Sequence, residues 1–330
     1  MKKIINNPDQ VVDEMLDGLV YAYDSLVERI PETMVIHRKA VKEGKVGLVS
    51  GGGSGHEPSH AGFVGKGMLS AAVAGQMFTS PTPDQVLEGI KASDEGAGVF
   101  LVIKNYTGDV MNFEMAQELA DLEDIEVETI VVDDDIAVED STFTAGKRGI
   151  AGTVLVHKIL GAAAEAGKSL QEIKTLADQL IPNIKSIGVA LNPATNPEVG
   201  KPGFEIDDDE IEFGVGIHGE PGYRREKLQP SKDLAKELVD KLKGEFDWTS
   251  GDEYAVLVNG MGATPLMEQF VFMNDVKKLL DDEEGLSLTF RKVGDYMTSI
   301  DMEGLSLTLV KLEDPQWLEY LNAPEDTISW

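Results

Sequence analysis

The amino-acid sequence predicts an α/β protein of two domains. Residues 1–185 are predicted to form an N-terminal three-layer α/β domain with a mostly parallel sheet, and residues 186–330 a C-terminal α/β domain with a mixed sheet. Three observations predict this. The chain has 330 residues, and domains commonly have about 100–200. Short apolar segments alternate with segments of helical periodicity, as in parallel βαβ units. Prolines and asparagines gather between residues 182 and 200, which is typical of a domain boundary.

The first half begins with a helix. Asn7 suits its N-cap and Pro8 its first position. Apolar residues then recur at helical spacing from Val12 to Ile30, which predicts one buried stripe. Further strands are predicted at 46–50, 69–74, 98–103 and 127–132, and helices at 82–92, 109–122, 152–166 and 170–180. The glycine run at 51–55 is predicted to be a loop that follows the first of these strands.

The second half is again mixed. Strands are predicted at 211–217, 254–259, 287–291 and 305–311, and helices at 231–243 and 265–280. About a dozen residues separate the last two strands, so these two could pair through a turn.

Composition excludes several functions. Asp and Glu total 59 against 29 Lys and Arg, a formal charge of -30. Such a surface repels nucleic acid and anionic membranes, so neither is expected as a partner. The absence of cysteine excludes disulfides, thiolate nucleophiles and Cys-ligated metals. No apolar signal core follows the N-terminus, and no apolar run approaches the roughly 20 residues that cross a bilayer. We therefore expect a cytoplasmic protein.

A phosphate-loop pattern at residues 162–169 is misleading. A true phosphate loop follows a strand, so that its amides can surround a phosphate. Here a predicted helix precedes it. Gly167 is instead predicted to end that helix, and Ser169 with Glu172 to form a capping box for the next one. We expect no nucleotide at this position.

Five histidines occur, and they differ in context. We expect His37 at the surface, beside two basic residues. His157 lies within an apolar helical pattern and is expected in the core or at its flank. His60 follows the glycine run and could have either a structural or a functional role. His56 and His218 each follow a predicted strand amid glycines, which lets a backbone approach a ligand closely.

The carboxyl ends of strands are where open α/β sheets bind ligands. His56 lies at such an end, although a flexible turn would also explain its setting. Lys104 closes an apolar strand, where it can donate to a ligand oxygen or face solvent. Asp109 opens the next helix, so an N-cap role is equally open to it.

His218 could act as a nucleophile, a base or a metal ligand. No HxH or HxxxH spacing supports a metal. A Ser-His-Asp triad is possible on residue types, but no GxSxG nucleophile elbow occurs. The aspartate runs 133–135 and 207–209 lack the ordered spacing of a calcium loop and are expected to be solvated loops. We expect no metal.

Together these motifs resemble a known family, the K subunits of dihydroxyacetone kinases. The resemblance spans nearly the whole chain and is specific because several motifs occur together. The matching segments are GGGSGHEPSH at 51–60, KNYTGD at 104–109, GIHGEPG at 216–222, VNGMGATP at 258–265 and GDYMTS at 294–299.

The resemblance implies covalent capture of dihydroxyacetone. A ring nitrogen of His218 would attack the C2 carbonyl and form a hemiaminal, which rejects glycerol because glycerol has no carbonyl. His56 and Asp109 match the family's acid–base and substrate-activating positions, without indicating which is the dominant base. The resemblance also implies substrate contacts at Gly53, Ser54, Gly55, Ser80, Lys104 and Asp109.

The resemblance further implies partners. Single-chain dihydroxyacetone kinases carry an additional nucleotide-binding domain that this sequence lacks. The chain is therefore expected to bind no cofactor itself, and ADP or ATP with magnesium is expected on a partner subunit L. Subunit L would be recharged by a phosphocarrier subunit M, ultimately from phosphoenolpyruvate. A homodimer is expected.

Two other functions stay open at this point. A paralogue of the subunit binds dihydroxyacetone as a co-activator of a transcription regulator, and could keep the covalent histidine without supporting transfer. A ligand-binding module of the related lipid-carrier architecture is a second alternative, against which the histidine motifs argue. Phosphate transfer with subunit L would distinguish a kinase subunit from the co-activator. A fatty acid retained by the purified protein would indicate the lipid-carrier module.

Overall fold

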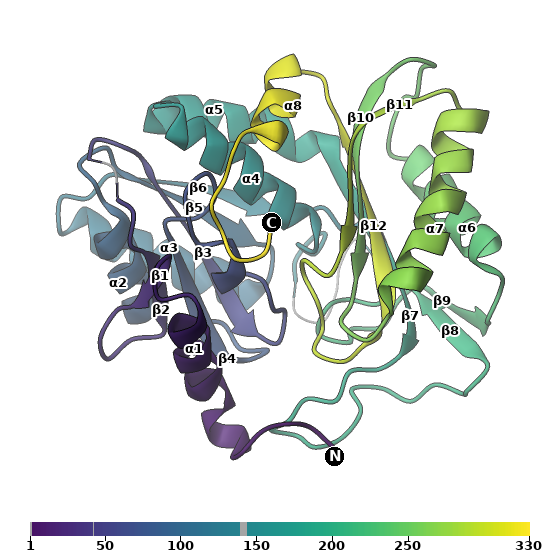
Figure 1. Ribbon diagram of the computed structural model, residues 1–330, viewed down its shortest axis with the longest axis horizontal. Coiled ribbons are helices and arrows are strands. Elements are labelled where there is room, and N and C mark those ends of the chain that lie inside the picture. Colours follow the sequence, from purple (N-terminus) through teal and green to yellow (C-terminus); the bar gives the residue numbers. More distant parts are fainter. Residues whose placement is uncertain (1, 42, 139–143) are drawn as a thin grey trace.

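The computed structural model describes residues 2–41, 43–138 and 144–330, and contains two six-stranded sheets with helices between and outside them (Figure 1). The first sheet has the order β1-β2-β4-β3-β5-β6. Its strands are β1 (Val27–Arg29), β2 (Val35–Arg38), β3 (Gly47–Ser54), β4 (Ala71–Met77), β5 (Val99–Lys104) and β6 (Val127–Val132). The four neighbouring strands β4, β3, β5 and β6 are parallel to one another. Strands β1 and β2 form an antiparallel edge beside β4.

Helices cover both faces of this sheet, as the prediction of three layers requires. One face packs against α2 (Pro83–Ser93) and α3 (Thr107–Asp121). The other packs against α1 (Val11–Ala22), α4 (Gly152–Glu165) and α5 (Leu170–Leu180). Strand β5, between β3 and β6, is buried along its whole length and is apolar from Val99 to Ile103, which is the pattern of a parallel strand covered on both faces.

The second sheet is mixed and has the order β11-β10-β12-β7-β8-β9, in which only β10 and β11 are parallel. Its strands are β7 (Ile184–Asn192), β8 (Glu210–Phe213), β9 (Arg224–Lys227), β10 (Glu253–Gly260), β11 (Ser287–Gly294) and β12 (Glu303–Lys311). Helices α6 (Ser231–Lys243) and α7 (Leu266–Lys277) cover its outer face, and α4 and α8 (Pro315–Asn322) lie on its inner face. The α/β fold class and the mixed sheet are confirmed, whereas the division after residue 185 stays a prediction.

Helix α4 lies between the two sheets and is buried from Gly152 to Ala164. A helix that is apolar on all sides belongs in a core. Its buried lysine, Lys158, donates to the carbonyls of Tyr320 and Ala323 at 2.7 and 2.8 Å. Burial lowers the pKa of Lys158 to about 8. These contacts tie the C-terminal segment to the centre of the molecule.

Several local predictions are confirmed. Asn7 Oδ1 accepts the N–H of Asp9, and Pro8 opens the short helix η1 (Pro8–Gln10) that leads into α1. Ser169 and Glu172 form a capping box at the start of α5. Gly167 has a φ of +84° at the end of α4. The phosphate-loop pattern is therefore a helix–helix connection.

Other predictions are wrong, for physical reasons. The stripe to Ile30 is interrupted, because α1 ends at Ala22 and Val27–Arg29 pairs with β2 instead. Strand β7 was not predicted. It lies within residues 182–200, where we expect the domain boundary, and its two neighbours in the sheet satisfy its backbone; the boundary itself stays a prediction. Strands β11 and β12 do not pair with each other, because β10 lies between them. The strand predicted at 211–217 is shorter in the structure: β8 ends at Phe213, and residues 214–217 lie outside it.

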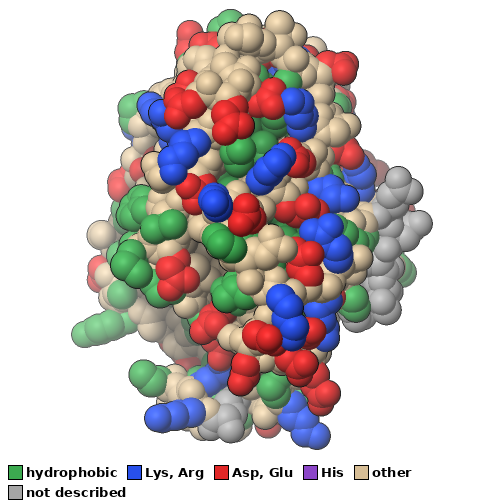
Figure 2. Space-filling model, turned by 90° about the vertical axis from the view of Figure 1, so that its right-hand side faces the viewer, with side chains coloured by type: hydrophobic (Ala, Val, Ile, Leu, Met, Phe, Trp, Pro, Cys, Tyr) green, Lys and Arg blue, Asp and Glu red, His purple; other side chains and the backbone are tan. Residues whose placement is uncertain are grey.

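Charges of both signs intermingle on the face that carries α6 and α7 (Figure 2). Ion pairs such as Lys236–Asp240 at 2.6 Å and Lys277–Asp282 at 2.7 Å lie there, and exposed pairs of this kind stabilise a fold only weakly. Among the described residues, no helix is both long and apolar enough to cross a membrane.

Candidate active site

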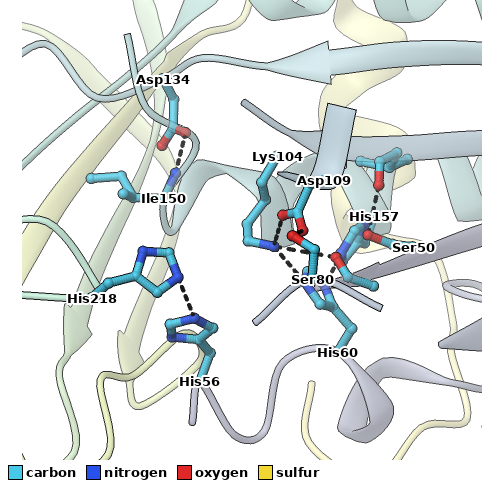
Figure 3. Close-up of polar contacts among 12 residues, drawn as sticks. Ser50, His56, His60, Ser80, Lys104, Asp109, Asp134, Ile150, His157 and His218 are labelled. Atoms are coloured by element: carbon cyan, nitrogen blue, oxygen red, sulfur yellow. Dashed lines mark hydrogen bonds and ion pairs between the residues drawn. The ribbon is translucent and has the colours of Figure 1, made fainter. Parts of the chain in front are cut away.

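Segments from both sheets meet at one cleft of about 650 Å³. The first sheet contributes the carboxyl ends of its parallel strands, and the second contributes the loop that follows β8 (Figure 3). The cleft is lined by Gly53, Phe78, Thr79, Ser80, Tyr106, Thr107, Gly108, Asp109, Asn112 and His218. The predicted residues Gly53, Ser80, Asp109 and His218 are thus brought together.

Two histidines that follow strands of different sheets lie side by side at this cleft, with His218 in its lining and His56 buried behind it. Nε2 of His56 lies 3.1 Å from Nε2 of His218, although 162 positions separate them in the sequence. The other nitrogen of each ring is also engaged. His56 Nδ1 lies 2.8 Å from the carbonyl of Thr298, and His218 Nδ1 lies 2.9 Å from a carboxylate oxygen of Glu220.

These contacts determine where the protons lie. A carbonyl and an ionised carboxylate only accept, so both Nδ1 atoms carry a proton and both Nε2 atoms are unprotonated in the neutral rings. The 3.1 Å contact is then a hydrogen bond only if the pair holds one further proton. Burial, with the nearby His218 and Lys104, lowers the pKa of His56 well below 6.5. In a pair that holds this further proton, His56 is therefore the acceptor and His218 the donor.

Glu220 stabilises a positive charge on His218. Burial alone would favour the neutral acid, but His218 and Arg148 outweigh it and lower the pKa of Glu220 to about 2. Its second oxygen accepts the backbone N–H of His218 at 2.9 Å. The carboxylate therefore fixes both the backbone and the ring of His218.

Arg148 is buried and pairs with Asp135 at 2.7 Å. Burial raises the pKa of Asp135 to about 6, although Arg148 opposes the shift. Asp134 accepts the N–H groups of Ile150 and Gly152 at the start of α4 (Figure 3). The expectation that residues 133–135 form a solvated loop is thus wrong for Asp134 and Asp135, because both carboxylates have fixed partners. Residues 207–209 are exposed, as expected, and the described residues contain no metal-binding cluster.

Asp109 lies in the first turn of α3, whose N-cap is Tyr106. The N-cap alternative for Asp109 is therefore wrong. Its carboxylate accepts the hydroxyl of Ser80 and, at 3.2 Å, the ammonium of Lys104. Lys104 is buried rather than solvent-facing, and it also donates to the carbonyl of Gly51 at 3.2 Å.

The glycine run is strand rather than loop, because β3 extends to Ser54. A Cβ on Gly53 would lie 2.5 Å from the backbone nitrogen of Thr79, so only glycine allows the strand and the next loop to meet. Ser54 donates to the carbonyl of Gly75 at 2.7 Å and supports the sheet. Ser54, Gly55, His56 and Lys104 do not line the cleft; His56 and Lys104 reach it through His218 and Asp109.

Several residues of the site were not predicted. The ring of Phe78 stacks on His56 at 5.2 Å, and the ring of Tyr106 meets His218 edge-on at 4.6 Å. Glu220 lies within the His218 motif and could have been identified from a carboxylate two residues after a histidine. The sequence offers no signal for the role of the Thr298 carbonyl, because any residue supplies one.

The other histidines are buried. His37 is only 6% exposed, so the surface expectation is wrong; it lies on β2, which is covered on both faces. Burial lowers its pKa. His157 lies in the core as expected and is hydrogen-bonded to His60, which is also buried.

Comparisons with known proteins identify relatives over the whole chain. The family model described as "Dak1 domain" matches residues 17–329. The chain is 68% identical over 329 residues to the dihydroxyacetone-binding subunit of a PTS-dependent dihydroxyacetone kinase of Lactococcus lactis. The alignment covers 100% of this chain and 99% of that protein. It is 64% identical to a subunit of the same description from Listeria innocua, with 100% of both chains covered. A solved structure described as the dihydroxyacetone kinase operon co-activator superposes with a TM-score of 0.91 at 47% identity, covering 96% of this chain and 97% of that one.

Proposed function

The chain belongs to the Dak1 domain family, and from this premise we propose that it is the dihydroxyacetone-binding subunit of a dihydroxyacetone kinase that takes its phosphate from a partner protein. Membership confirms the resemblance drawn from the motifs. The observation that carries the proposal is the pair of His56 and His218 beside an ionised Glu220. That arrangement supplies a nucleophile, an acid and a counter-charge at one point of the cleft.

Capture of the ketone follows from the shared proton. His218 passes its Nε2 proton to His56, and the freed nitrogen forms a bond to C2 of dihydroxyacetone. The π electrons of the carbonyl move onto its oxygen, which takes the proton back from His56. The product is a hemiaminal whose positive ring remains paired with Glu220. The pair begins with one extra proton and the adduct keeps it, so no proton is exchanged with solvent.

Transfer would depend on Asp109. Its carboxylate, held by Ser80 and Lys104, takes the proton of a terminal hydroxyl as that oxygen attacks the γ-phosphorus of a nucleotide. The bond from this phosphorus to the bridging oxygen breaks and leaves ADP. The covalent bond at His218 fixes the hydroxyl for this in-line attack. The cleft of about 650 Å³ leaves room beside a three-carbon ligand for the approach of a donor group.

The partners belong to the same proposal. Magnesium and the nucleotide would be held by a subunit L, and L would be recharged by a phosphocarrier subunit M from phosphoenolpyruvate. A homodimer is proposed as well. It is supported by apolar side chains on α7 that are more than half exposed, since such patches often mark interfaces. These are Leu266, Met267, Phe270 and Val271.

The alternative is a co-activator that binds dihydroxyacetone without transferring phosphate. Its support is the close superposition on a solved co-activator. A curated co-activator of Lactococcus lactis is 47% identical to this chain, against 68% for the kinase subunit of the same organism. We favour the kinase for that reason.

The test combines two measurements on purified protein. Intact-mass spectrometry after incubation with dihydroxyacetone measures capture. The rate at which dihydroxyacetone phosphate forms with subunits L and M and the phosphoenolpyruvate carrier chain measures transfer. We expect the wild type to show both and His218→Ala to lose capture. Capture without transfer, with partners that phosphorylate dihydroxyacetone on a known K subunit, would point to the co-activator instead.

A further inference from the structure

A chain of buried polar side chains runs inward from the cleft. It begins at Lys104, at the end of β5, continues to His60 after β3 and ends at His157 on α4 (Figure 3). Nζ of Lys104 lies 3.3 Å from Nε2 of His60, and Nδ1 of His60 lies 2.9 Å from Nε2 of His157. Neither histidine lines the cleft, and neither takes part in capture or transfer as derived above.

The direction of each hydrogen bond follows from chemistry. A lysine ammonium only donates, so His60 accepts with Nε2 and must carry its proton on Nδ1. That proton is donated to Nε2 of His157. His157 then carries its own proton on Nδ1, which has no partner among the described residues. Burial and the charge of Lys104 lower the pKa of both rings, in keeping with neutral imidazoles.

The ammonium of Lys104 has three protons and three acceptors. They are a carboxylate oxygen of Asp109, the carbonyl of Gly51 and Nε2 of His60. A Cβ on Gly52 would lie 2.4 Å from Nζ, so the ammonium fills the space that glycine leaves. Lysine has a flexible stem and does not hold one orientation by itself. The three acceptors supply that orientation.

We propose that His60 and His157 are positioning residues for phosphoryl transfer: they hold the ammonium of Lys104 against the carboxylate of Asp109, and they have no part in capture at His218. The inference rests on the proposed function. His157 acts at one remove, by keeping the proton of His60 on Nδ1 so that Nε2 can accept. Without it, His60 can present an N–H to Lys104, and two donors then face each other.

The capture half of the site lies beside Lys104 but shares no hydrogen bond with His60 or His157 among the described residues. His218 is held by Glu220, Tyr106 and His56, and none of these side chains touches His60 or His157 through a hydrogen bond among those the structure shows. Misplacing a reacting group by about 1 Å can lower a rate by roughly a hundredfold. The expected defect is therefore confined to transfer.

Matched substitutions test this. His60→Leu removes the acceptor for Lys104, whereas His60→Gln keeps an amide oxygen that can accept. His157→Leu and His157→Gln form the same comparison one step further in. For each full-length variant, capture of dihydroxyacetone is measured by intact mass and by binding affinity, and transfer by the single-turnover rate with phosphorylated subunit L. Circular dichroism establishes that each variant is folded.

Both Leu variants are expected to capture dihydroxyacetone within about twofold of the wild type and to transfer phosphate at least roughly tenfold more slowly. The Gln variants are expected to recover most of that rate. Transfer at the wild-type rate in folded Leu variants would overturn the inference, as would equal losses of capture and transfer or a Gln variant as slow as its Leu counterpart. If either Leu variant fails to fold, the other pair decides. A wild type that captures but does not transfer with a competent L subunit would remove the proposed function and this inference together.

Discussion

His218 and Glu220 are two residues apart, and their side chains form one ion-paired unit in the cleft. In the proposed capture, the unit would let His218 act as a nucleophile and would then stabilise the positive charge of the adduct. His218 and, to a lesser degree, Arg148 outweigh burial and lower the pKa of Glu220 to about 2, so this carboxylate is ionised. In the proposed capture, His56 would accept the proton that the nucleophile releases.

Replacing the charge of Glu220 should therefore weaken capture. Glu220→Gln retains a hydrogen-bond acceptor but loses the counter-charge, and a buried hydrogen bond to a charged group contributes about 1.5–3 kcal/mol. We expect the affinity for dihydroxyacetone to fall by at least roughly tenfold, measured by calorimetry or intact mass. Asp207→Asn, which removes an exposed carboxylate, is the matched control. Unchanged affinity in a folded Glu220→Gln variant would show that the adduct needs no counter-charge.

The sequence alone places His56, Asp109 and His218 at strand ends, and these three do meet within one site. Their supporting contacts could not be predicted in the same way. The acceptor for His56 is a backbone carbonyl 242 positions away. The acceptors of Lys104 come from β3, α3 and the segment after β3. Such contacts depend on tertiary packing, which no local pattern encodes.

Among the elements, α4 differs most from an ordinary surface helix. It packs against both sheets, so every side chain on it from Gly152 to Ala164 must be accommodated in the core. The apolar sequence of α4 predicts this burial.

Four short elements were not predicted: the strands β1, β2 and β9 and the helix α8. These elements are short, and their pairing or packing partners lie elsewhere in the chain. Strand β7 was missed because flanking prolines and a central glycine resemble a linker.

The burial of His157 in α4 makes stability depend on pH. Burial, with a smaller contribution from Lys104, lowers its pKa from 6.5 to about 3. Below pH 6.5 the unfolded chain binds a proton that the folded chain excludes, so this stability is present above the unfolded pKa and is lost as the pH falls toward the folded value. Between pH 7 and pH 5 the loss amounts to about 2 kcal/mol.

His157→Gln removes this titration, so its free energy of unfolding should fall less between pH 7 and pH 5 than that of the wild type. Urea unfolding at the two pH values, at one protein concentration, measures the difference. A loss of stability that is equal at both pH values leaves this comparison unaffected. Equal slopes for the two proteins would mean that His157 titrates normally in the folded state.

At the scale of the whole molecule, two sheets enclose a shared central layer, and the net charge is -30. The composition predicts that charge directly, and the strand–helix alternation predicts the fold class. The order of strands in the second sheet was beyond reach, because antiparallel pairing joins segments over a hundred residues apart, such as β7 and β12.

Self-repulsion of this charge should destabilise the compact state, and salt should relieve it. Raising sodium chloride from roughly 10 to 200 mM shortens the Debye length from about 30 Å to less than 10 Å. Surface ion pairs are also weakened, but each contributes only about 0–1 kcal/mol. We expect the melting temperature to rise by roughly 1–3 °C. Potassium chloride should act identically, and a falling melting temperature would show that the ion pairs outweigh the repulsion.

The segment after β3 is fastened to the loop between β11 and β12 by backbone hydrogen bonds from Thr298 to His56 and from Ile300 to Gly55, at 3.2 and 2.7 Å. A loop of more than 240 residues must close before these bonds can form, and contacts of such high sequence separation arise slowly. Secondary structure and much of each sheet can therefore form earlier in refolding. Under the proposed function, dihydroxyacetone capture should therefore return only in the last kinetic phase of refolding, so that its recovery reports when folding is complete.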